Sequence, residues 1–204
     1  MPTQLSPLTF NQQIKASISK IHSFPDQQLD LFIQKMIFRT LKKKEYLLSP
    51  PKTCNFFALV LQGSFRLFKP AEDKENTLHF FTDNDWVADF ESFVAQKPTV
   101  NYIQAMDRAE IALLSINDIH QLIHQSPAFL IMGKVMKGWS ISTLQYTSLI
   151  NDTPEERYKL LMATHPDWIL RFPQMHLASY LGMSRETFSR VKKKTSLVKR
   201  RVLP

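Results

Sequence analysis

The spacing of apolar residues divides this chain into segments with different periods. Phe10, Ile14, Ile18 and Ile21 recur at helical intervals, which predicts a helix over 10–21. Helical spacing resumes at Pro25, where a second short helix is expected to begin. The N-terminal segment is therefore predicted to be helical as far as residue 36.

Between residues 37 and 116 the period shortens to the alternation that is typical of strands. The run 65–69 alternates clearly between inward and outward positions. The expected strands are 37–41, 45–48, 55–61, 64–69, 77–81, 100–106 and 110–115. Gln62-Gly63 has the composition of a two-residue turn, and the charged segment 70–76 that of a hairpin tip. Short strands with turns at intervals of about eight to twelve residues predict a sandwich or a barrel.

Helical spacing returns with a short helix over 117–125 and a long helix from Pro127 to about residue 150. The long helix carries a seam with the 3-4-3-4-3 spacing of paired helices. The seam consists of Met132, Val135, Trp139, Ser142, Tyr146 and Leu149. Other apolar residues lie off the seam, so we expect one face to pack on the β domain and the other on a second copy. The residues expected in this dimer interface are Met132, Val135, Trp139, Tyr146 and Leu149. The alternative is a helix buried inside a single monomer.

Residues 151–156 have the features of a hinge and a domain boundary. Pro154 disfavours helix at Thr153. Thr153 and Glu156 have the spacing of a capping box, which predicts a new helix over 157–162. The long helix is therefore expected to end here, before a separate C-terminal domain.

The segment 173–194 has the pattern of two helices separated by a tight turn. Pro173 suits the first turn of the first helix, and Gly182 is expected to turn the chain at a positive φ. Ser184 is expected to cap the second helix through its hydroxyl. The inner faces would consist of Leu177, Ala178, Leu181, Phe188 and Val191. This spacing is typical of a helix-turn-helix, whose second helix enters the DNA major groove.

The outer face of the second helix carries groups that recognise bases and phosphates. Arginine suits bidentate contact with guanine, and glutamate can accept a bond from cytosine N4. The candidate DNA-contacting residues are Ser184, Arg185, Glu186, Ser189, Arg190, Lys192, Lys193 and Lys194. The last twenty residues hold eight basic side chains and one acidic one, so they carry +7 of the net charge of +8. Such a surface suits a phosphate backbone, whereas the alternative is an ordinary solvated helix face.

The composition excludes several classes of protein. The chain has 204 residues, of which 44% are hydrophobic, so we expect a packed core rather than disorder. A single cysteine, Cys54, rules out a disulfide scaffold, a multi-thiolate zinc site and a four-thiolate iron–sulfur cluster within one chain. Its aromatic neighbours indicate a small core residue. No signal peptide or membrane-spanning run is evident, and we expect a cytoplasmic protein without membrane contact, cofactor or metal.

The order of these segments resembles the cyclic-AMP receptor and fumarate-nitrate regulator (Crp/Fnr) family of bacterial transcription factors. The stretch Leu-Gly-Met-Ser-Arg-Glu-Thr-Phe-Ser-Arg at 181–190 is similar to the family's signature, and 85–93 is similar to its nucleotide cassette. The resemblance implies an α+β fold in three parts. These are a cyclic-nucleotide-binding-like sensor β-roll (double-stranded β-helix, jelly-roll-like) with flanking helices over 1–126, a dimerisation helix over 127–150, and a winged-helix-like helix-turn-helix domain with a short or missing wing over 151–204.

The same resemblance implies partners for the protein. Members of the family bind palindromes in double-stranded DNA as homodimers, and the positions that match Arg185, Glu186 and Arg190 read TGTGA-like half-sites. RNA polymerase is a candidate partner.

The expected effector pocket departs from the family's pattern. Cyclic-nucleotide binders use a Gly-Glu pair on the ribose, an Arg on the cyclic phosphate and a Thr-Ser pair on adenine. An ungapped match places Ala88-Asp89, Thr99 and Leu144-Gln145 at these positions. Thr99 has no charge with which to pair a buried phosphate. We therefore expect the effector not to be cyclic AMP, but a more apolar ligand or none.

Two other functions compete with a DNA-binding regulator. A cupin-like metal enzyme needs clustered His and carboxylate ligands, whereas His120 and His124 lack a third ligand nearby in the sequence. No phosphate loop or nucleophile motif occurs, so we expect no enzyme activity. A ligand-sensing β-roll could instead act through protein contacts without specific DNA binding, but the Ser-Arg-Glu run at 184–186 and the basic tail favour DNA.

Overall fold

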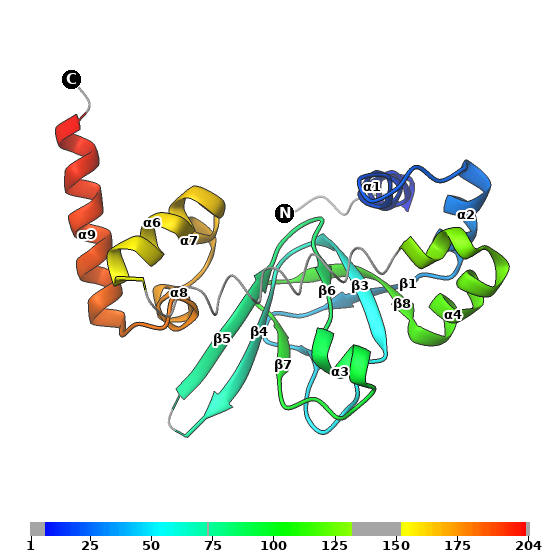
Figure 1. The fold of residues 1–204 in the computed structure, drawn as a ribbon, viewed down its shortest axis with the longest axis horizontal. Helices are drawn as coiled ribbons and strands as arrows, with labels where there is room; N and C mark the ends of the chain where they lie inside the picture. The colour runs from blue at the N-terminus through cyan, green and yellow to red at the C-terminus, as the bar shows by residue number, and fades with distance from the viewer. Residues whose placement is uncertain (1–6, 73, 132–151, 203–204) are drawn as a thin grey trace. The chain divides into compact units, whose positions relative to one another are not determined.

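The computed structural model describes residues 7–72, 74–131 and 152–202. The chain divides into two compact units, Met1–Leu67 with Phe80–Ser140, and Phe68–His79 with Ile141–Pro204 (Figure 1). The elements up to residue 131 are α1 (Pro7–Ser19), α2 (Asp26–Gln34), β1 (Ile37–Leu41), β2 (Tyr46–Leu48), β3 (Phe56–Gln62), β4 (Phe65–Ala71), β5 (Lys74–Phe81), β6 (Trp86–Val87), α3 (Phe90–Ala95), β7 (Tyr102–Ala105), β8 (Ala109–Ser115), α4 (Ile116–Gln125) and the 3-10 helix η1 (Pro127–Ile131).

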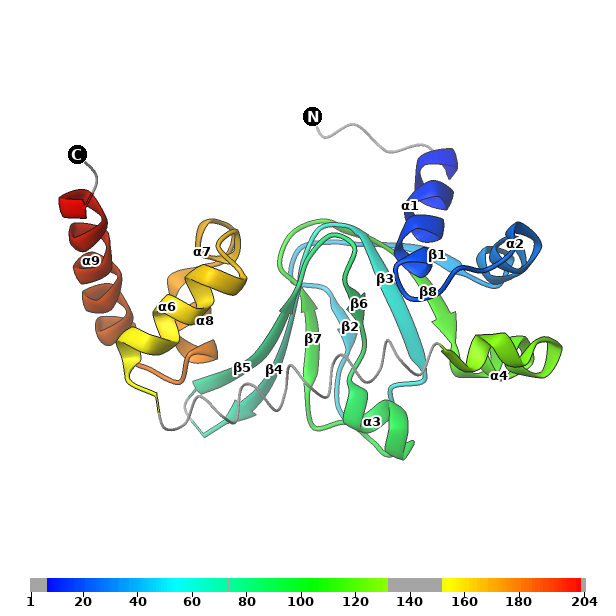
Figure 2. The ribbon, with the colours of Figure 1, turned by 45° about the horizontal axis from the view of Figure 1, so that its top comes forward.

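The eight strands found among the described residues form two four-stranded sheets, which together make the predicted β-roll. The strand order is β1-β8-β3-β6 in one sheet and β2-β7-β4-β5 in the other. The pairs β1–β8, β3–β8, β3–β6 and β2–β7 are antiparallel. Helices α2 and α4 are neighbours in both views (Figure 1, Figure 2), and Nζ of Lys35, the C-cap of α2, donates to Oε1 of Gln121 in α4 at 2.7 Å.

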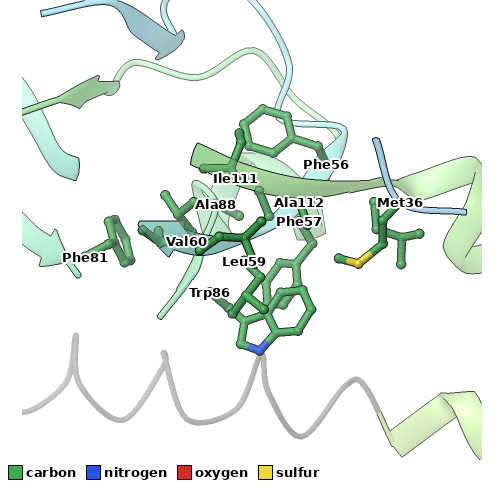
Figure 3. Packing of buried hydrophobic residues seen from close by; sticks show 14 of the residues in the cluster. Met36, Phe56, Phe57, Leu59, Val60, Phe81, Trp86, Ala88, Ile111 and Ala112 are labelled. Carbon is green, nitrogen blue, oxygen red and sulfur yellow. The ribbon is translucent and has the colours of Figure 1, made fainter. Parts of the chain in front are cut away.

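The core of the β-roll is centred on β3 and β8. Residues 56–61 of β3 are all buried, as expected for a strand that is covered on both faces. The ring of Phe57 stacks on Trp86 of β6 with centroids 5.1 Å apart (Figure 3). Ile14 and Ile18 of α1 are buried in the same cluster, as the helical spacing predicted. The apolar runs therefore position the sheets and the helices that cover them.

The turn after β3 depends on its glycine. Gly63 has φ of +102°, and a Cβ at this position would lie 2.7 Å from Ala109 Cα. Its amide donates to Asp83 Oδ1 at 2.7 Å, and the amide of Ser64 donates to Asp107 Oδ1 at 2.7 Å. Two carboxylates thus satisfy the backbone of this turn, which the sequence predicted from Gln62-Gly63.

Several predicted boundaries were wrong, each for a local reason. The hairpin tip is shorter than 70–76, because β4 extends to Ala71 and β5 begins at Lys74. Charged residues also occur in exposed positions of antiparallel strands, so their charge did not by itself indicate a loop. β6 and α3 were not predicted, since two and six residues are too few to establish a period. Residues 127–131 form a 3-10 helix rather than the first turn of an α-helix, and the predicted seam over 132–149 lies outside the described residues.

The described helices after residue 151 are α6 (Pro154–Thr164), α7 (Trp168–Arg171), α8 (Gln174–Tyr180) and α9 (Arg185–Val202). The predicted capping box begins α6: the Thr153 amide donates to Glu156 Oε2 at 2.7 Å, and the Glu156 amide donates to Thr153 Oγ1 at 3.3 Å. Residues buried among these helices include Tyr158, Leu161, Trp168, Phe172, Leu177, Ala178, Leu181, Phe188 and Val191. The short helix α7, which was not predicted, places Trp168 in this core.

The basic tail continues the last helix. α9 extends as one helix from Arg185 to Val202, and no strand occurs between residues 152 and 202, which agrees with a short or missing wing. None of the helices in the described ranges is both long and apolar enough to cross a membrane.

Candidate nucleic-acid interface and effector cassette

The end of α8 is closed by a Schellman motif. The Gly182 amide donates to Ser179 O at 3.0 Å, and the Met183 amide donates to Ala178 O at 3.0 Å. Gly182 has φ of +63°, which agrees with the predicted positive value. Pro173 is the N-cap residue of α8 rather than its first helical residue. The turn between the two helices is therefore defined by backbone bonds on both sides of Gly182.

The N-terminus of α9 is capped and anchored as predicted. The Thr187 amide donates to Ser184 Oγ at 3.1 Å, which satisfies one of the first amides of the helix. Phe188 and Val191 are buried, and the ring of Phe188 meets that of Tyr158 edge to face at 5.5 Å. These contacts fix which face of α9 is directed away from the core.

Four of the predicted base-reading side chains lie on that outer face. Arg185, Glu186, Ser189 and Arg190 are all exposed. The pKa of Glu186 is lowered by its own backbone amide and by the Ser184 hydroxyl, so this carboxylate is charged at neutral pH. The first turns of α9 therefore present two guanidinium groups and one carboxylate to solvent.

The three predicted phosphate-binding lysines differ in their surroundings. Lys193 is exposed, whereas Lys192 is half-buried. Lys194 Nζ lies 3.2 Å from Glu155 Oε1 of α6, and this bond lowers the pKa of Glu155. A DNA phosphate would thus compete with the Glu155 carboxylate for the Lys194 ammonium group.

One guanidinium group that sequence reasoning missed contacts the turn. Arg157 of α6 is half-buried, and its Nη1 donates to Leu181 O at 2.9 Å and to Gly182 O at 3.4 Å. Its Nε donates to Asp152 O at 3.0 Å. Nothing in the spacing of the sequence identifies this residue, because its bonds join segments that lie 24 and 25 residues apart.

In the β-roll, the predicted cassette residues are brought together around a buried carboxylate. Asp89 is the N-cap of α3, and it accepts bonds from the Ser92 amide at 3.4 Å and from Asn101 Nδ2 at 3.0 Å. The Thr99 hydroxyl donates to the same carboxylate and accepts a bond from the Asn101 amide at 2.8 Å. Both Asp89 and Thr99 are buried, as is Ala88. The comparison with the family's pattern considered Asp89 and Thr99 as two separate departures. In the structure, the two side chains belong to one hydrogen-bond network.

Cys54 borders this network. The backbone amide of Cys54 donates to Ser92 Oγ at 2.9 Å, and Ser92 Oγ donates to Lys97 O at 2.6 Å. Burial raises the pKa of Cys54 to about 11. The predicted role as a small core residue is consistent with this environment, since a reactive cysteine needs a lowered pKa and access to solvent.

The basic residues nearest to the cassette in the sequence, Lys97 and Arg108, are exposed, as expected for turn positions. Nη2 of Arg108 lies 3.7 Å from Oε1 of Glu110, so this guanidinium is paired with a carboxylate of the neighbouring strand, β8. Arg66 of β4 is buried, although it was not singled out in the sequence. Leu144 and Gln145, the positions expected to face a base, lie outside the described residues.

The histidines and carboxylates do not assemble a metal site within the described ranges. No group of three or more His, Cys, Asp or Glu side chains there has a suitable arrangement. His120 and His124 of α4 are both exposed.

Comparison with known proteins places these features in context. Residues 38–126 match the family model of the cyclic nucleotide-binding domain. No curated protein matches the chain by sequence. The structure is similar to a double mutant of CooA from Carboxydothermus hydrogenoformans, with 23% identity over 82% of this chain and 79% of that chain and a TM-score of 0.67.

Two further solved structures have the same fold. The c-di-GMP-responsive global regulator CLP of Xanthomonas campestris has 20% identity over 86% of this chain and 93% of that chain, with a TM-score of 0.67. FixK2 of Bradyrhizobium japonicum has 14% identity over 80% of this chain and 86% of that chain, with a TM-score of 0.68.

Proposed function

We propose that this chain, which combines the fold of Crp/Fnr regulators with a cyclic nucleotide-binding domain over 38–126, is a sequence-specific DNA-binding transcription regulator. The observation that carries the proposal is the outer face of α9. Arg185, Glu186 and Arg190 are exposed there, while Phe188 and Val191 fix the opposite face in the core. A capped helix with this distribution can enter a major groove without any rearrangement of its packing.

Each group on this face has a distinct role. The Arg185 and Arg190 guanidinium groups donate to guanine edges, and the Glu186 carboxylate accepts from cytosine. Ser184 and Ser189 can bond base edges or phosphates. Lys192, Lys193 and Lys194 attract the phosphate backbone, and Lys194 must leave Glu155 to do so.

The active form is a homodimer. The seam of Met132, Val135, Trp139, Tyr146 and Leu149 has the spacing of a paired helix, and two-fold proteins match two-fold DNA sites. On this proposal residues 1–126 sense, 127–150 dimerise and 151–204 bind DNA. RNA polymerase is the partner to which such a dimer would signal.

The DNA-binding claim is tested by selection from a pool of random duplexes. We expect the wild-type chain to enrich a palindrome, with half-sites about one helical turn apart, or a multiple of it, centre to centre. The variants Arg185→Ala and Arg190→Ala should enrich sequences that are degenerate at one position of each half-site. A pool without any consensus after repeated rounds would contradict the proposal.

The effector is proposed not to be cyclic AMP. The buried Asp89 carboxylate already accepts bonds from Ser92, Thr99 and Asn101, so a cyclic phosphate placed here would meet a negative charge instead of a cation. The buried cation among the described strands, Arg66, belongs to β4 rather than to this segment. An apolar ligand, or none, suits the site better.

Calorimetry with cyclic AMP and cyclic GMP tests the effector proposal. We expect no binding at micromolar concentrations. A dissociation constant of about 10 μM or below, equivalent to about −7 kcal/mol, would contradict it. Repeating the titration on Arg66→Met would then show whether this cation replaces the family's arginine.

A further inference from the structure

Arg157 joins two pieces of backbone that flank the DNA-reading helix. Its Nη1 donates to Leu181 O and Gly182 O in the turn that precedes α9, and its Nε donates to Asp152 O in the hinge that precedes α6. A single side chain therefore links the segment before α6 to the turn between α8 and α9. A Cβ added at Gly182 would lie 3.2 Å from Nη1, so the guanidinium packs directly against the turn.

The two carbonyl groups that Arg157 contacts do not accept either of the hydrogen bonds of the Schellman motif. Within that motif, Ala178 O and Ser179 O accept the amides of Met183 and Gly182. Leu181 O and Gly182 O lie beyond these bonds, at the C-terminal end of α8, where a cation is favourable. α8 has seven residues, too few for its own helix propensity to hold the turn.

We infer that Arg157 is a positioning residue for DNA recognition: it sets the direction in which α9 leaves the turn and thereby where Arg185 meets a base. The inference rests on the proposed function and adds a residue that contacts no DNA. Bidentate base contacts tolerate little displacement, so a looser turn should cost sequence discrimination more than overall DNA affinity.

The planar fork of the guanidinium is what this role requires. Its Nε and Nη1 bond carbonyl groups of two separate segments at fixed angles, whereas a lysine ammonium is a point charge on a flexible stem. Arg157→Lys keeps the charge and loses the fork, and Arg157→Gln loses both. Lys159, an exposed residue of the same helix, supplies the control Lys159→Gln, which removes one charge from α6 without touching the turn.

The test measures the ratio of affinities for the selected palindrome and a scrambled duplex, at several salt concentrations. Arg157→Lys should reduce the ratio by about five- to a hundredfold, the discrimination of one bidentate contact, with an unchanged salt slope. Lys159→Gln should leave the ratio unchanged. In an Arg185→Ala background, Arg157→Lys should reduce the ratio by a smaller factor than in the wild-type background, because one of the contacts that it positions is already gone.

Three outcomes overturn the inference. If Arg157→Lys only lowered the folded fraction, both affinities would fall together and the ratio would stay constant. If Arg157 contacted a phosphate, Arg157→Lys would retain the ratio and Arg157→Gln would lower the salt slope by about one. If the wild-type ratio were close to one, the proposed function would fail together with the inference.

Amide hydrogen exchange tests the inference without DNA. Exchange at Gly182 and Met183 should be faster in Arg157→Lys than in the wild-type chain, and unchanged in Lys159→Gln.

Discussion

At the scale of residues, the proposed function divides the outer face of α9 into side chains that would read bases and side chains that would attract phosphates. Arg185→Ala and Arg190→Ala should each cost about 1–3 kcal/mol on the selected palindrome and relax base preference at one position. Lys193→Ala should instead weaken binding to all sequences alike and reduce the salt slope by about one. Fluorescence anisotropy over a range of salt concentrations measures both. If the arginine variants behaved like the lysine variant, α9 would not be the reading helix.

Cys54 should be almost unreactive in the folded protein. Burial raises its pKa to about 11, so at pH 8 its thiolate fraction is about a hundredfold below that of an ordinary thiol. Alkylation by iodoacetamide should therefore be slower by at least that factor than in urea. Because the unfolded thiol ionises first, stability should fall as the pH rises from about 9 towards 11. Equal alkylation rates with and without urea would disprove the burial.

The residues that could be predicted from the sequence are those whose roles are local. The capping hydroxyl of Ser184 and the positive φ of Gly182 depend on neighbours within four positions. The bonds of Arg157 to the turn and of Asn101 to Asp89 join distant segments, and the buried Arg66 breaks the alternation of its strand. No periodicity or spacing encodes such contacts, so they required the folded structure.

At the scale of elements, the Asp89 network holds α3 against the loop that leads to β7. Thr99→Val keeps the shape of the side chain but removes its donor from a buried carboxylate, which should destabilise the protein by about 1–3 kcal/mol. Urea unfolding followed by fluorescence measures the change. The exposed variant Thr164→Val is a matched control and should change stability by less than about 0.5 kcal/mol. Equal effects of the two variants would show that the network contributes nothing.

Elements with a long and regular pattern were predicted well, and short or charged ones were not. The strands around β3 and β8, the capping box of α6 and the helix-turn-helix agree with the sequence within a few residues. β6 and α7 contain Trp86 and Trp168, which are buried by tertiary packing that no window of a few residues contains. The N-cap of α3, Asp89, has a local bond from the Ser92 amide, but Thr99 and Asn101 also donate to it from a distant loop. Residues 70–76, which include the end of β4 and the start of β5, were taken for a hairpin tip because the segment is rich in charged residues.

At the scale of the whole molecule, the resemblance to Crp/Fnr regulators is confirmed for the fold, and residues 38–126 match the family model of the cyclic nucleotide-binding domain. Dimerisation stays a prediction from the seam. Trp139→Ala should weaken the dimer by about 2–4 kcal/mol, the cost of truncating a large buried aromatic side chain. Light scattering across a dilution series gives the dimer dissociation constant. A wild-type chain that is monomeric at micromolar concentration would contradict the prediction.

The most direct test of the account is the binding of the wild-type chain to its selected palindrome, measured by fluorescence anisotropy at physiological salt against a scrambled duplex of equal length. We predict two chains per duplex and an affinity for the palindrome at least about a thousandfold higher. Equal affinities for the two duplexes, with both lost as salt is raised, would mean that the basic helix only attracts phosphates, and would contradict sequence-specific regulation by this protein.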